Sequence, residues 1–375
     1  MKKIAYVATI PAVIDAFLSG HILAASRQWQ VKLISHPQGA ELLQHLEAEF
    51  IPLAFERKMS PWRDLVTLCQ LVAVFRHERF DLVHTIMPKT ALLGMLAARL
   101  AGVPHRIHTF TGQVWATRSG WKRWLLKLID RLIVTLASEV MIDSPSQRDF
   151  LIQEGVLPEG KGVVIGRGSI CGVDERRFHP DDSCRAKLRE QLNIAPSDRV
   201  ILFLGRLNRD KGTLELAQAF NDIARCREDV VLVWVGAEEE VSFDSLQSLC
   251  AQHGHKMRRV PYTTSPEQYM AMADIFCLPS YREGFGQVII EAGAVGLPTV
   301  ASKIYGITDA VDDGVTGLLT PVSDVPALVS ALLRLLDDAE LRVAMGQAAR
   351  QRVSRLFASE IITAGWQALY KKLLV

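Results

Sequence analysis

Short apolar runs alternate along the chain with longer stretches in which apolar residues recur every three or four positions. In the first half, the runs at residues 3–8, 30–35, 82–85, 105–110 and 139–143 have the length and composition of β-strands. Helical patterns separate these runs. Because alternating strands and helices place the helices on the faces of a parallel sheet, this half is predicted to form a doubly wound α/β unit.

The same alternation starts again after residue 180. Four strands are predicted there, at residues 199–204, 230–235, 275–278 and 299–301. The second of these runs is apolar throughout, as expected for a parallel strand that is buried on both faces. Helical patterns again lie between the runs. A second doubly wound sheet is therefore predicted in this half.

The length of the chain also favours two domains, since 375 residues exceed what one compact core usually holds. Residues 166–180 combine Gly, Arg and Pro with little periodicity and form the predicted linker. The predicted domains are residues 1–175 and 176–355, followed by a C-terminal helix at 356–375 that packs back toward the first domain. Ligands of doubly wound sheets bind beyond the carboxyl ends of the strands. The active site is thus expected in a central cleft between two facing Rossmann-like domains.

Charge and cysteine content narrow the classes of function. The net charge of +2 is too small to indicate a nucleic-acid partner, but it is unevenly distributed: residues 1–180 hold 22 of the 43 Lys and Arg and only 16 of the 41 Asp and Glu. This basic half is expected to meet an anionic partner. None of the six cysteines forms a CxxC pair, so they are interpreted as buried thiols of a cytoplasmic protein. No apolar run is long enough to cross a membrane.

Residues 279–292 (PSYREGFGQVIIEA) carry the strongest signal for a binding site, because they follow a predicted strand and open a helix. Gly284 and Gly286 allow the backbone to approach a ligand closely, and the start of the helix offers free N–H groups to an anion. Glu291 inside the helix is placed to hold a ribose, and Glu283 to reach a sugar ring. One such glutamate alone would be interpreted as a solvated residue, but the loop, the glycines and both acids coincide.

Residues 203–212 (FLGRLNRDKG) provide a second signal between a predicted strand and a helix. Gly205 marks the turn. Arg206 and Lys211 stand at the carboxyl edge of the sheet, where two cations can clamp a diphosphate. Alone, they are equally well interpreted as solvated surface residues. In combination with residues 279–292 the phosphate site is favoured.

These motifs, in this order, resemble those of the retaining glycosyltransferases of family 4, which have the GT-B fold. Glu283 and Glu291 match a glutamate pair of that family, and Arg206 and Lys211 match its Gly-Arg…Lys-Gly turn. The resemblance implies a nucleotide-diphosphate sugar as donor, with UDP as the expected nucleotide, and no metal or other cofactor. It implies Glu283, Arg206 and Lys211 as catalytic residues. The implied donor site consists of Gly205, Arg206, Lys211, Glu283, Gly284, Phe285, Gly286 and Glu291.

The first half departs from the family pattern. Many relatives have Thr-x-His-Gly at the end of one strand, whereas residues 108–113 are HTFTGQ here. Thr111 stands where that histidine is often found, so His108, Thr111 and Gly112 are the candidates for the acceptor side, and which of the first two replaces the histidine is left open. Residues 110–115 look like a subgroup that builds bacterial surface polysaccharides such as capsule and O-antigen. The implied acceptor is a saccharide, free or linked to polyprenyl diphosphate.

Residues 115–133 form a basic amphipathic helix with tryptophans at its start. Such helices lie in a membrane interface with Lys and Arg among the lipid phosphates. The candidates for contact with an anionic membrane are Trp121, Lys122, Arg123, Trp124 and Lys127. The alternative is a core helix with a solvated cationic face. A cytoplasmic protein on the inner face of the membrane is thus expected.

Two other classes of function remain as alternatives: a nucleotide-sugar epimerase or phosphorylase of GT-B fold, and a non-catalytic protein that binds sugar nucleotides. Two weaker motifs are set aside. Residues 166–172 approach a dinucleotide fingerprint, but the last glycine is one place late. Asp312 and Asp313 are interpreted as a solvated turn, so no metal site is predicted.

Overall fold

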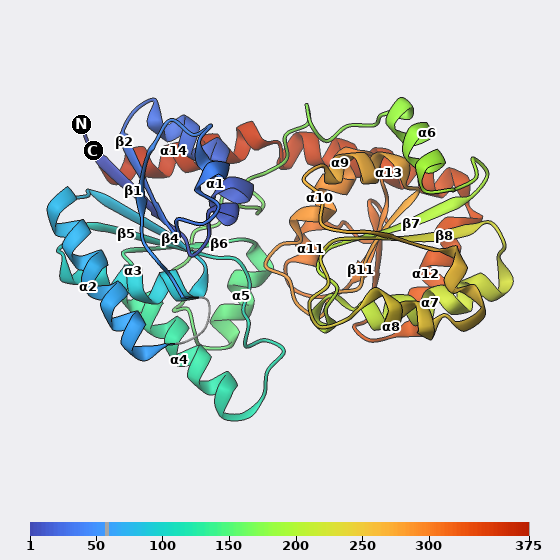
Figure 1. Cartoon of the computed structure of the whole chain (residues 1–375), viewed down its shortest axis with the longest axis horizontal. Coiled ribbons are helices and arrows are strands. Elements are labelled where there is room, and N and C mark those ends of the chain that lie inside the picture. The colour runs from blue at the N-terminus through green and yellow to red at the C-terminus, as the bar shows by residue number, and fades with distance from the viewer. Residues whose placement is uncertain (57–59, 375) are drawn as a thin grey trace. The chain divides into compact units, whose positions relative to one another are not determined.

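The computed structural model of the chain describes residues 1–56 and 60–374. It divides into two compact units. Unit 1 consists of Met1–Gly172 and Ser359–Val375, and unit 2 of Val173–Ala358. Each unit has a six-stranded parallel sheet covered by helices (Figure 1). The prediction of two doubly wound α/β domains is thereby confirmed.

The sheet of unit 1 has the strand order β3-β2-β1-β4-β5-β6, so the direction of winding reverses between β1 and β4. All neighbouring strands are parallel. The strands are β1 (Lys3–Val7), β2 (Gln30–Ser35), β3 (Glu49–Pro52), β4 (Leu82–Ile86), β5 (His105–Phe110) and β6 (Glu139–Ile142).

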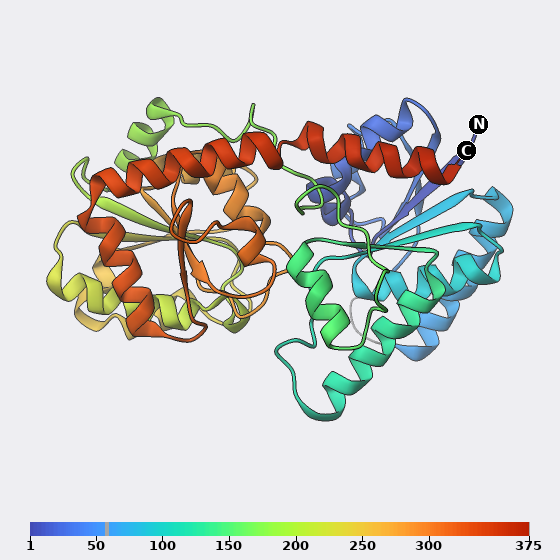
Figure 2. The ribbon, with the colours of Figure 1, turned by 180° about the vertical axis from the view of Figure 1, so that it is seen from behind.

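Helices cover both faces of this sheet (Figures 1 and 2). Side chains alternate along β1: Ile4 and Tyr6 pack in the core beneath two helices, α1 (Pro11–Ser26) and α14 (Ser359–Leu374). Ala5 and Val7 belong to the opposite core. The helices on that face are α2 (Pro61–Glu78), α3 (Pro88–Leu100), α4 (Gly120–Leu136) and α5 (Pro145–Gln153).

Helix α14 closes unit 1 through buried polar contacts as well as apolar packing. Trp366 Nε1 donates to the carbonyl of Ile170 at 3.0 Å, and Tyr370 Oη lies 2.8 Å from His84 Nδ1. His21 on α1 reaches the same Ile170 carbonyl at 2.6 Å. The last helix is therefore an integral part of the core of unit 1.

Unit 2 repeats the strand order of unit 1, as β9-β8-β7-β10-β11-β12, with the reversal between β7 and β10. The strands are β7 (Arg199–Leu204), β8 (Val230–Val235), β9 (Met257–Val260), β10 (Ile275–Leu278), β11 (Thr299–Ser302) and β12 (Gly317–Thr320). The longer helices are α6 (Asp182–Gln191), α7 (Thr213–Cys226), α10 (Gln287–Ala294), α12 (Val325–Asp337) and α13 (Ala339–Leu356). The shorter helices are α8 (Phe243–Leu249), α9 (Pro266–Met272) and α11 (Ile307–Ala310).

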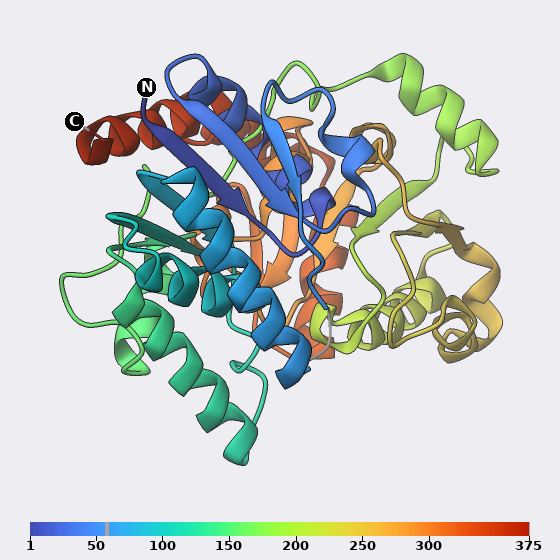
Figure 3. The same cartoon turned by 60° about the vertical axis from the view of Figure 1, so that its left-hand side comes forward.

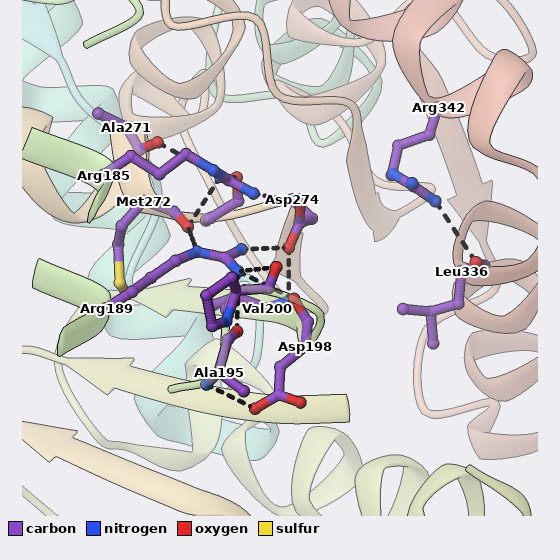
Figure 4. Close-up of polar contacts among 12 residues, drawn as sticks. Arg185, Arg189, Ala195, Asp198, Val200, Ala271, Met272, Asp274, Leu336 and Arg342 are labelled. Carbon is purple, nitrogen blue, oxygen red and sulfur yellow. Dashed lines mark hydrogen bonds and ion pairs between the residues drawn. The ribbon is translucent and has the colours of Figure 1, made fainter. Parts of the chain in front are cut away.

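A buried ionic network fixes the amino-terminal edge of the sheet in unit 2 (Figure 4). The carboxylate of Asp274, just before β10, accepts hydrogen bonds at 2.7 Å from Arg185, Arg189 and the N–H of Val200. Arg189 also donates to the carbonyl of Asp198 at 2.9 Å. Because a buried carboxylate is tolerated when it is fully hydrogen-bonded, Asp274 joins α6 to the start of β7 and β10. The opposite edge of this sheet, at the carboxyl ends of its strands, is where a ligand site is expected.

The structure also corrects several sequence-based expectations. The strands β3, β9 and β12 and the helices α2, α6, α8, α9 and α11 were not predicted. The helix expected at residues 115–133 begins at Gly120, because Trp115 is buried in the loop before it and donates to Asp130 at 2.7 Å. The cysteines are free thiols, but Cys69 and Cys226 are exposed.

Candidate functional site

The carboxyl ends of β7 and β10 define the candidate site in unit 2. These strands are neighbours, and the winding of the sheet reverses between them, which is where doubly wound sheets bind ligands. The loop at residues 205–212 follows β7, and the loop at 279–286 follows β10. The two strongest motifs of the sequence therefore emerge side by side at one edge.

The two loops are in direct contact. Gly212 has φ +68°, and a Cβ atom there would lie 2.0 Å from the carbonyl oxygen of Pro279, so only glycine permits this approach. The N–H of Tyr281 donates to the carbonyl of Asp210 at 2.8 Å. Arg282 Nε donates to the Asp210 carboxylate at 2.8 Å. The loops thus form one rigid assembly.

Lys211 and Glu283 meet at the centre of this assembly. Lys211 Nζ lies 2.5 Å from Glu283 Oε1, and the Ser280 hydroxyl donates to the same oxygen at 2.9 Å. Both charged side chains are largely buried. The structure therefore brings together the cation predicted to bind a diphosphate and the acid predicted to bind a sugar, and it pairs them with each other.

Arg206 lies on the other side of the turn and is more exposed. Its guanidinium donates to Glu239 at 2.7 Å, and Asn208 Nδ2 donates to the second oxygen of that carboxylate, also at 2.7 Å. Glu239 belongs to the loop after β8. This loop can approach the turn because residue 236 is glycine: at its φ of +138°, a Cβ atom would lie 2.0 Å from the carbonyl oxygen of Gly205.

Sequence reasoning missed several members of this cluster, namely Asn208, Asp210, Glu239 and Ser280. Two signals could have found them. Asn208 stands three residues before Lys211, which is the spacing of an N-cap residue, and its side chain accepts from the Lys211 N–H at 3.1 Å. Gly236 and Ala237, directly after the apolar run 230–235, are followed by three consecutive glutamates, and this pattern marks the third loop at the same edge.

The glycines before α10 shape the backbone rather than contribute side chains. Gly286 has φ +85° and caps the helix. Gly306, at φ +81°, would place a Cβ 2.6 Å from the carbonyl oxygen of Gly284. Phe285 is buried, with its ring centroid 5.3 Å from that of Phe357. Phe285 therefore anchors the loop in the core and offers only its backbone to a ligand.

Glu291 lies inside α10 and is half-buried. Gln287 Nε2, one turn earlier, donates to its Oε1 at 3.2 Å. Burial raises the pKa of Glu291 to about 7, and the hydrogen bond from Gln287 opposes this only in part. The carboxyl group therefore changes its charge close to neutral pH.

The acceptor-side candidates of unit 1 occupy different environments. His108 is buried within the sheet, where its Nδ1 lies 3.0 Å from Thr85 Oγ1 and 3.1 Å from the Thr85 carbonyl oxygen. Burial lowers the pKa of His108 to about 3 and keeps it neutral. Thr111 is exposed after the end of β5, and Gly112 follows with φ +122°. Of these three residues, Thr111 presents a side chain to solvent.

Helix α4 carries an exposed apolar stripe. The side chains of Trp121 and Trp124 are 69% and 64% exposed, and Leu128 and Leu132 continue the stripe along the helix. Lys122 is also exposed and lies over the Trp121 ring. No helix in the described part of the chain is long and apolar enough to span a membrane.

Two of the predicted membrane-facing cations serve another purpose. Arg123 and Lys127 bind the Glu154 carboxylate at 2.8 and 2.7 Å, and both lie over the ring of buried Trp115. They hold α4 against the end of α5. Their charges are therefore partly compensated within unit 1.

Comparison with known families assigns the chain to a class. Residues 22–168 match the model of the glycosyl transferase 4-like domain, and residues 185–352 match that of the glycosyl transferases group 1. Together with the fold, these matches define a glycosyltransferase of GT-B fold. The chain belongs to the group 1 family of glycosyltransferases, with a family 4-like first domain.

Two curated relatives align with most of the chain. The capsular polysaccharide biosynthesis glycosyltransferase CapM of Staphylococcus aureus is 28% identical over 377 residues, covering 100% of this chain and 98% of the relative. The UDP-Gal:alpha-D-GlcNAc-diphosphoundecaprenol alpha-1,3-galactosyltransferase of Escherichia coli is 29% identical, covering 91% of this chain and 89% of the relative.

Two solved structures share the fold across the whole chain. Sucrose-phosphate synthase from Thermosynechococcus elongatus has a TM-score of 0.85 at 24% identity, covering 100% of this chain and 99% of that one. Anabaena HepE, solved in complex with UDP and glucose, has a TM-score of 0.81 at 22% identity with the same coverage.

Proposed function

We propose that this glycosyltransferase transfers a hexosyl or N-acetylhexosaminyl group from a UDP-sugar, with retention of anomeric configuration, to a saccharide linked to polyprenyl diphosphate. Its role would be the assembly of a bacterial surface polysaccharide. The observation that carries the proposal is the contact between the loops 205–212 and 279–286, which brings Lys211 and Glu283 to one point at the switch of the sheet. The names of the relatives CapM and the diphosphoundecaprenol galactosyltransferase support the acceptor class.

The charges of the site suit the departure of a diphosphate. As the bond between the anomeric carbon and UDP breaks, negative charge develops on the diphosphate, and we assign its stabilisation to Lys211, Arg206 and the N–H groups near Gly286. An acceptor hydroxyl attacks the anomeric carbon from the same face and passes its proton to the departing phosphate oxygen. Glu283 accepts hydrogen bonds from the donor sugar, and Glu291 from the ribose. The reaction needs no metal or further cofactor.

The pairing of Lys211 with Glu283 adds a constraint to this assignment. Each group neutralises the other before substrate arrives, so a diphosphate gains the full charge of Lys211 only if Glu283 takes a new partner. The hydroxyls of the donor sugar provide that partner. Phosphate and sugar are therefore recognised together, and UDP alone should bind less tightly than a UDP-sugar.

A nucleotide and acceptor panel tests the proposal and separates its alternatives. The unfolding temperature should rise with UDP more than with GDP or dTDP. With UDP-hexoses and polyprenyl-diphosphate N-acetylglucosamine as acceptor, a disaccharide should form, and the coupling constant of its anomeric proton should show retention. Donor consumption without an acceptor would instead indicate an epimerase, and UDP binding with no consumption a non-catalytic protein.

We also propose that unit 1 rests on the anionic inner face of the cytoplasmic membrane through α4. The exposed Trp121, Trp124, Leu128 and Leu132 suit the acyl boundary, and Lys122 suits the lipid phosphates. A lipid-linked acceptor would then be met where it is anchored.

Sedimentation with vesicles tests this second proposal. Wild-type protein should sediment with vesicles containing phosphatidylglycerol, and the double variant W121E/W124E should not. The matched control is V343E/I361E, which places two glutamates at other exposed apolar positions. Equal sedimentation of wild type and W121E/W124E would refute membrane contact through α4.

A further inference from the structure

The carboxylate of Glu239 joins the loop after β8 to the turn after β7. Its Oε1 accepts a hydrogen bond from Arg206 Nη1 at 2.7 Å, and its Oε2 accepts one from Asn208 Nδ2 at 2.7 Å. Both oxygens are therefore engaged, one with a cation and one with a buried amide. A single side chain from outside residues 203–212 thus fixes two residues within them.

The backbone of Glu239 is itself fixed to this turn. The N–H of Leu207 donates to the carbonyl of Ala237 at 2.8 Å, and the carbonyl of Leu207 accepts from the N–H groups of Glu239 and Val241 at 3.2 and 3.1 Å. Leu207 is buried in the core of unit 2. These main-chain hydrogen bonds do not depend on the Glu239 side chain, so replacing that side chain should leave the two loops joined.

Asn208 connects Glu239 to the second cation of the turn. Its side-chain oxygen accepts from the N–H of Lys211 at 3.1 Å, while its side-chain nitrogen donates to Glu239. A carboxylate only accepts and an N–H only donates, so these partners fix the orientation of the amide. Glu239 therefore orients the Arg206 side chain directly and supports the backbone at Lys211 through Asn208.

The hydrogen bond to Glu239 uses only part of the Arg206 guanidinium. A guanidinium carries five N–H groups in a planar fork, and Glu239 accepts from one nitrogen, Nη1. Within the part of the chain that the structure describes, the Arg206 side chain has no other hydrogen bond. The side chain is 58% exposed, so its remaining N–H groups are open to a ligand. Glu239 can therefore hold Arg206 while two parallel N–H groups remain for phosphate oxygens.

The negative charge of Glu239 also repels a diphosphate, and this effect opposes the first. Glu239 is 44% exposed, so water and salt screen the repulsion. An arginine that is held in place before the ligand arrives avoids the entropic cost of being immobilised on binding, and screening does not reduce that advantage. We therefore expect the orientation of Arg206 to outweigh the repulsion.

We propose that Glu239 is a positioning residue of the donor site, which holds Arg206 in the orientation that meets the diphosphate. The inference rests on the proposed function and deepens it, because it adds a third loop to the two that carry the sequence motifs. Glu239 acts through Arg206 and touches no substrate atom. The loop after β8 thereby contributes to phosphate recognition without contributing a cation.

Titration calorimetry with UDP on the full chain tests this role in a double-mutant cycle. E239A should weaken UDP binding roughly three- to tenfold, the effect of immobilising one flexible side chain on binding. R206A should weaken UDP binding as well, and E239A should add nothing in the R206A background, because the side chain that it orients is gone. The matched control is E240A, which removes the same charge from the next residue. Glu240 is exposed, its side chain has no hydrogen bond or ion pair among the described residues, and E240A should bind UDP as the wild type does.

Uridine, which has no phosphate, separates orientation from a loss of structure. In an NMR titration, E239A and wild type should bind uridine equally, because Arg206 has no phosphate to meet. Weaker uridine binding in E239A, unchanged UDP affinity in E239A, an equal loss of UDP affinity in the wild-type and R206A backgrounds, or tighter UDP binding in both E239A and E240A would overturn the positioning role and leave the donor site standing. Wild-type affinity of R206A for UDP would instead overturn the donor assignment of Arg206, and the role of Glu239 with it.

Discussion

Units 1 and 2 have the same strand order, yet the loops at their switch points are built differently. In unit 2, Gly212, Gly236 and Gly306 allow backbones to approach within distances that exclude any Cβ. In unit 1, β1 leads through Thr9 and Ile10 directly into α1, and no glycine occurs in that turn. Figure 3 shows the ribbons of both units from a third side. These close approaches between loops therefore depend on loop composition, and the shared topology does not supply them.

The difference extends to charged and polar groups. Unit 2 holds Lys211 and Glu283 at its switch point, whereas Lys89, near the switch point of unit 1, is bound to Asp64 at 2.7 Å. Unit 1 instead carries an exposed tryptophan stripe on α4. The same strand order therefore carries different side chains in the two units.

The largest expected effect comes from removing the cation that distinguishes the switch point of unit 2. K211A should lower kcat about a hundredfold or more, since one lost charge-stabilising contact at a transition state costs about 3 kcal/mol. The measurement is steady-state transfer with a UDP-sugar. K187A, which removes an exposed lysine of α6, should retain normal turnover. Normal turnover in K211A would show that Lys211 is not the catalytic difference between the two switch points.

A second prediction addresses the glycine contact between the two donor loops. G212A should lower the free energy of unfolding by at least about 2 kcal/mol, because the alanine is forced into a left-handed conformation and against Pro279. G314A is the control: it has a similar φ of +79° but no atom within 4 Å of the new Cβ, so about 1 kcal/mol is expected. Urea denaturation measures both. Equal losses would show that the close approach carries no energetic weight.

The two units should also differ in acid. Burial lowers the pKa of His21 to about 4 and those of His84 and His108 to about 3, all in unit 1. A lowered histidine pKa gives stability that is present above pH 6.5 and lost as pH falls, by up to about 1.4 kcal/mol per pH unit for each group. The described histidines of unit 2 are not buried. Unit 1 should therefore lose stability first between pH 6.5 and 4.5.

Hydrogen exchange with a labelling pulse at fixed pH follows each unit separately. The carboxyls with raised pKa, Asp130 in unit 1 and Glu291 in unit 2, act in the opposite direction, one in each unit, and so largely cancel in the comparison. Protection of β1 and β4 should fall before that of β7 and β8. The reverse order would contradict the assignment of acid sensitivity to the buried histidines.

The smallest predicted effect concerns Glu291. Its pKa of about 7 means that the carboxylate form, to which the proposed function assigns the hydrogen bonds from a ribose, becomes dominant as pH rises. Affinity for UDP-glucose, whose diphosphate does not titrate there, should increase by up to roughly tenfold from pH 6 to 8. E291Q should remove this dependence of affinity on pH. A pH profile of E291Q equal to that of the wild type would show that Glu291 does not contact the nucleotide. Because the pKa is raised, the unliganded fold should lose stability as pH rises through 7, and E291Q should remove that loss.

The sequence predicted the central strands well because they are apolar, buried along almost their whole length and bounded by clear turns. Strand β3 was missed since Glu49–Pro52 is a short edge strand that is only partly buried. The convergence of residues 205–212 and 279–292 could be predicted, because their strands end at one edge. The partners of the charged residues could not: the position of Glu239 depends on the approach of a third loop, and His108 is enclosed by a neighbouring strand.

The two units are completed at different times during synthesis because of the order of their segments in the chain. Unit 2 is one uninterrupted segment, Val173–Ala358, whereas unit 1 is completed by Ser359–Val375. The N–H of Val173 donates to the carbonyl of Phe357 at 2.8 Å, so the segment begins and ends at the same place. A ribosome therefore completes unit 2 first, and unit 1, which began to emerge earlier, waits for α14 to cover Tyr6, His21 and His84.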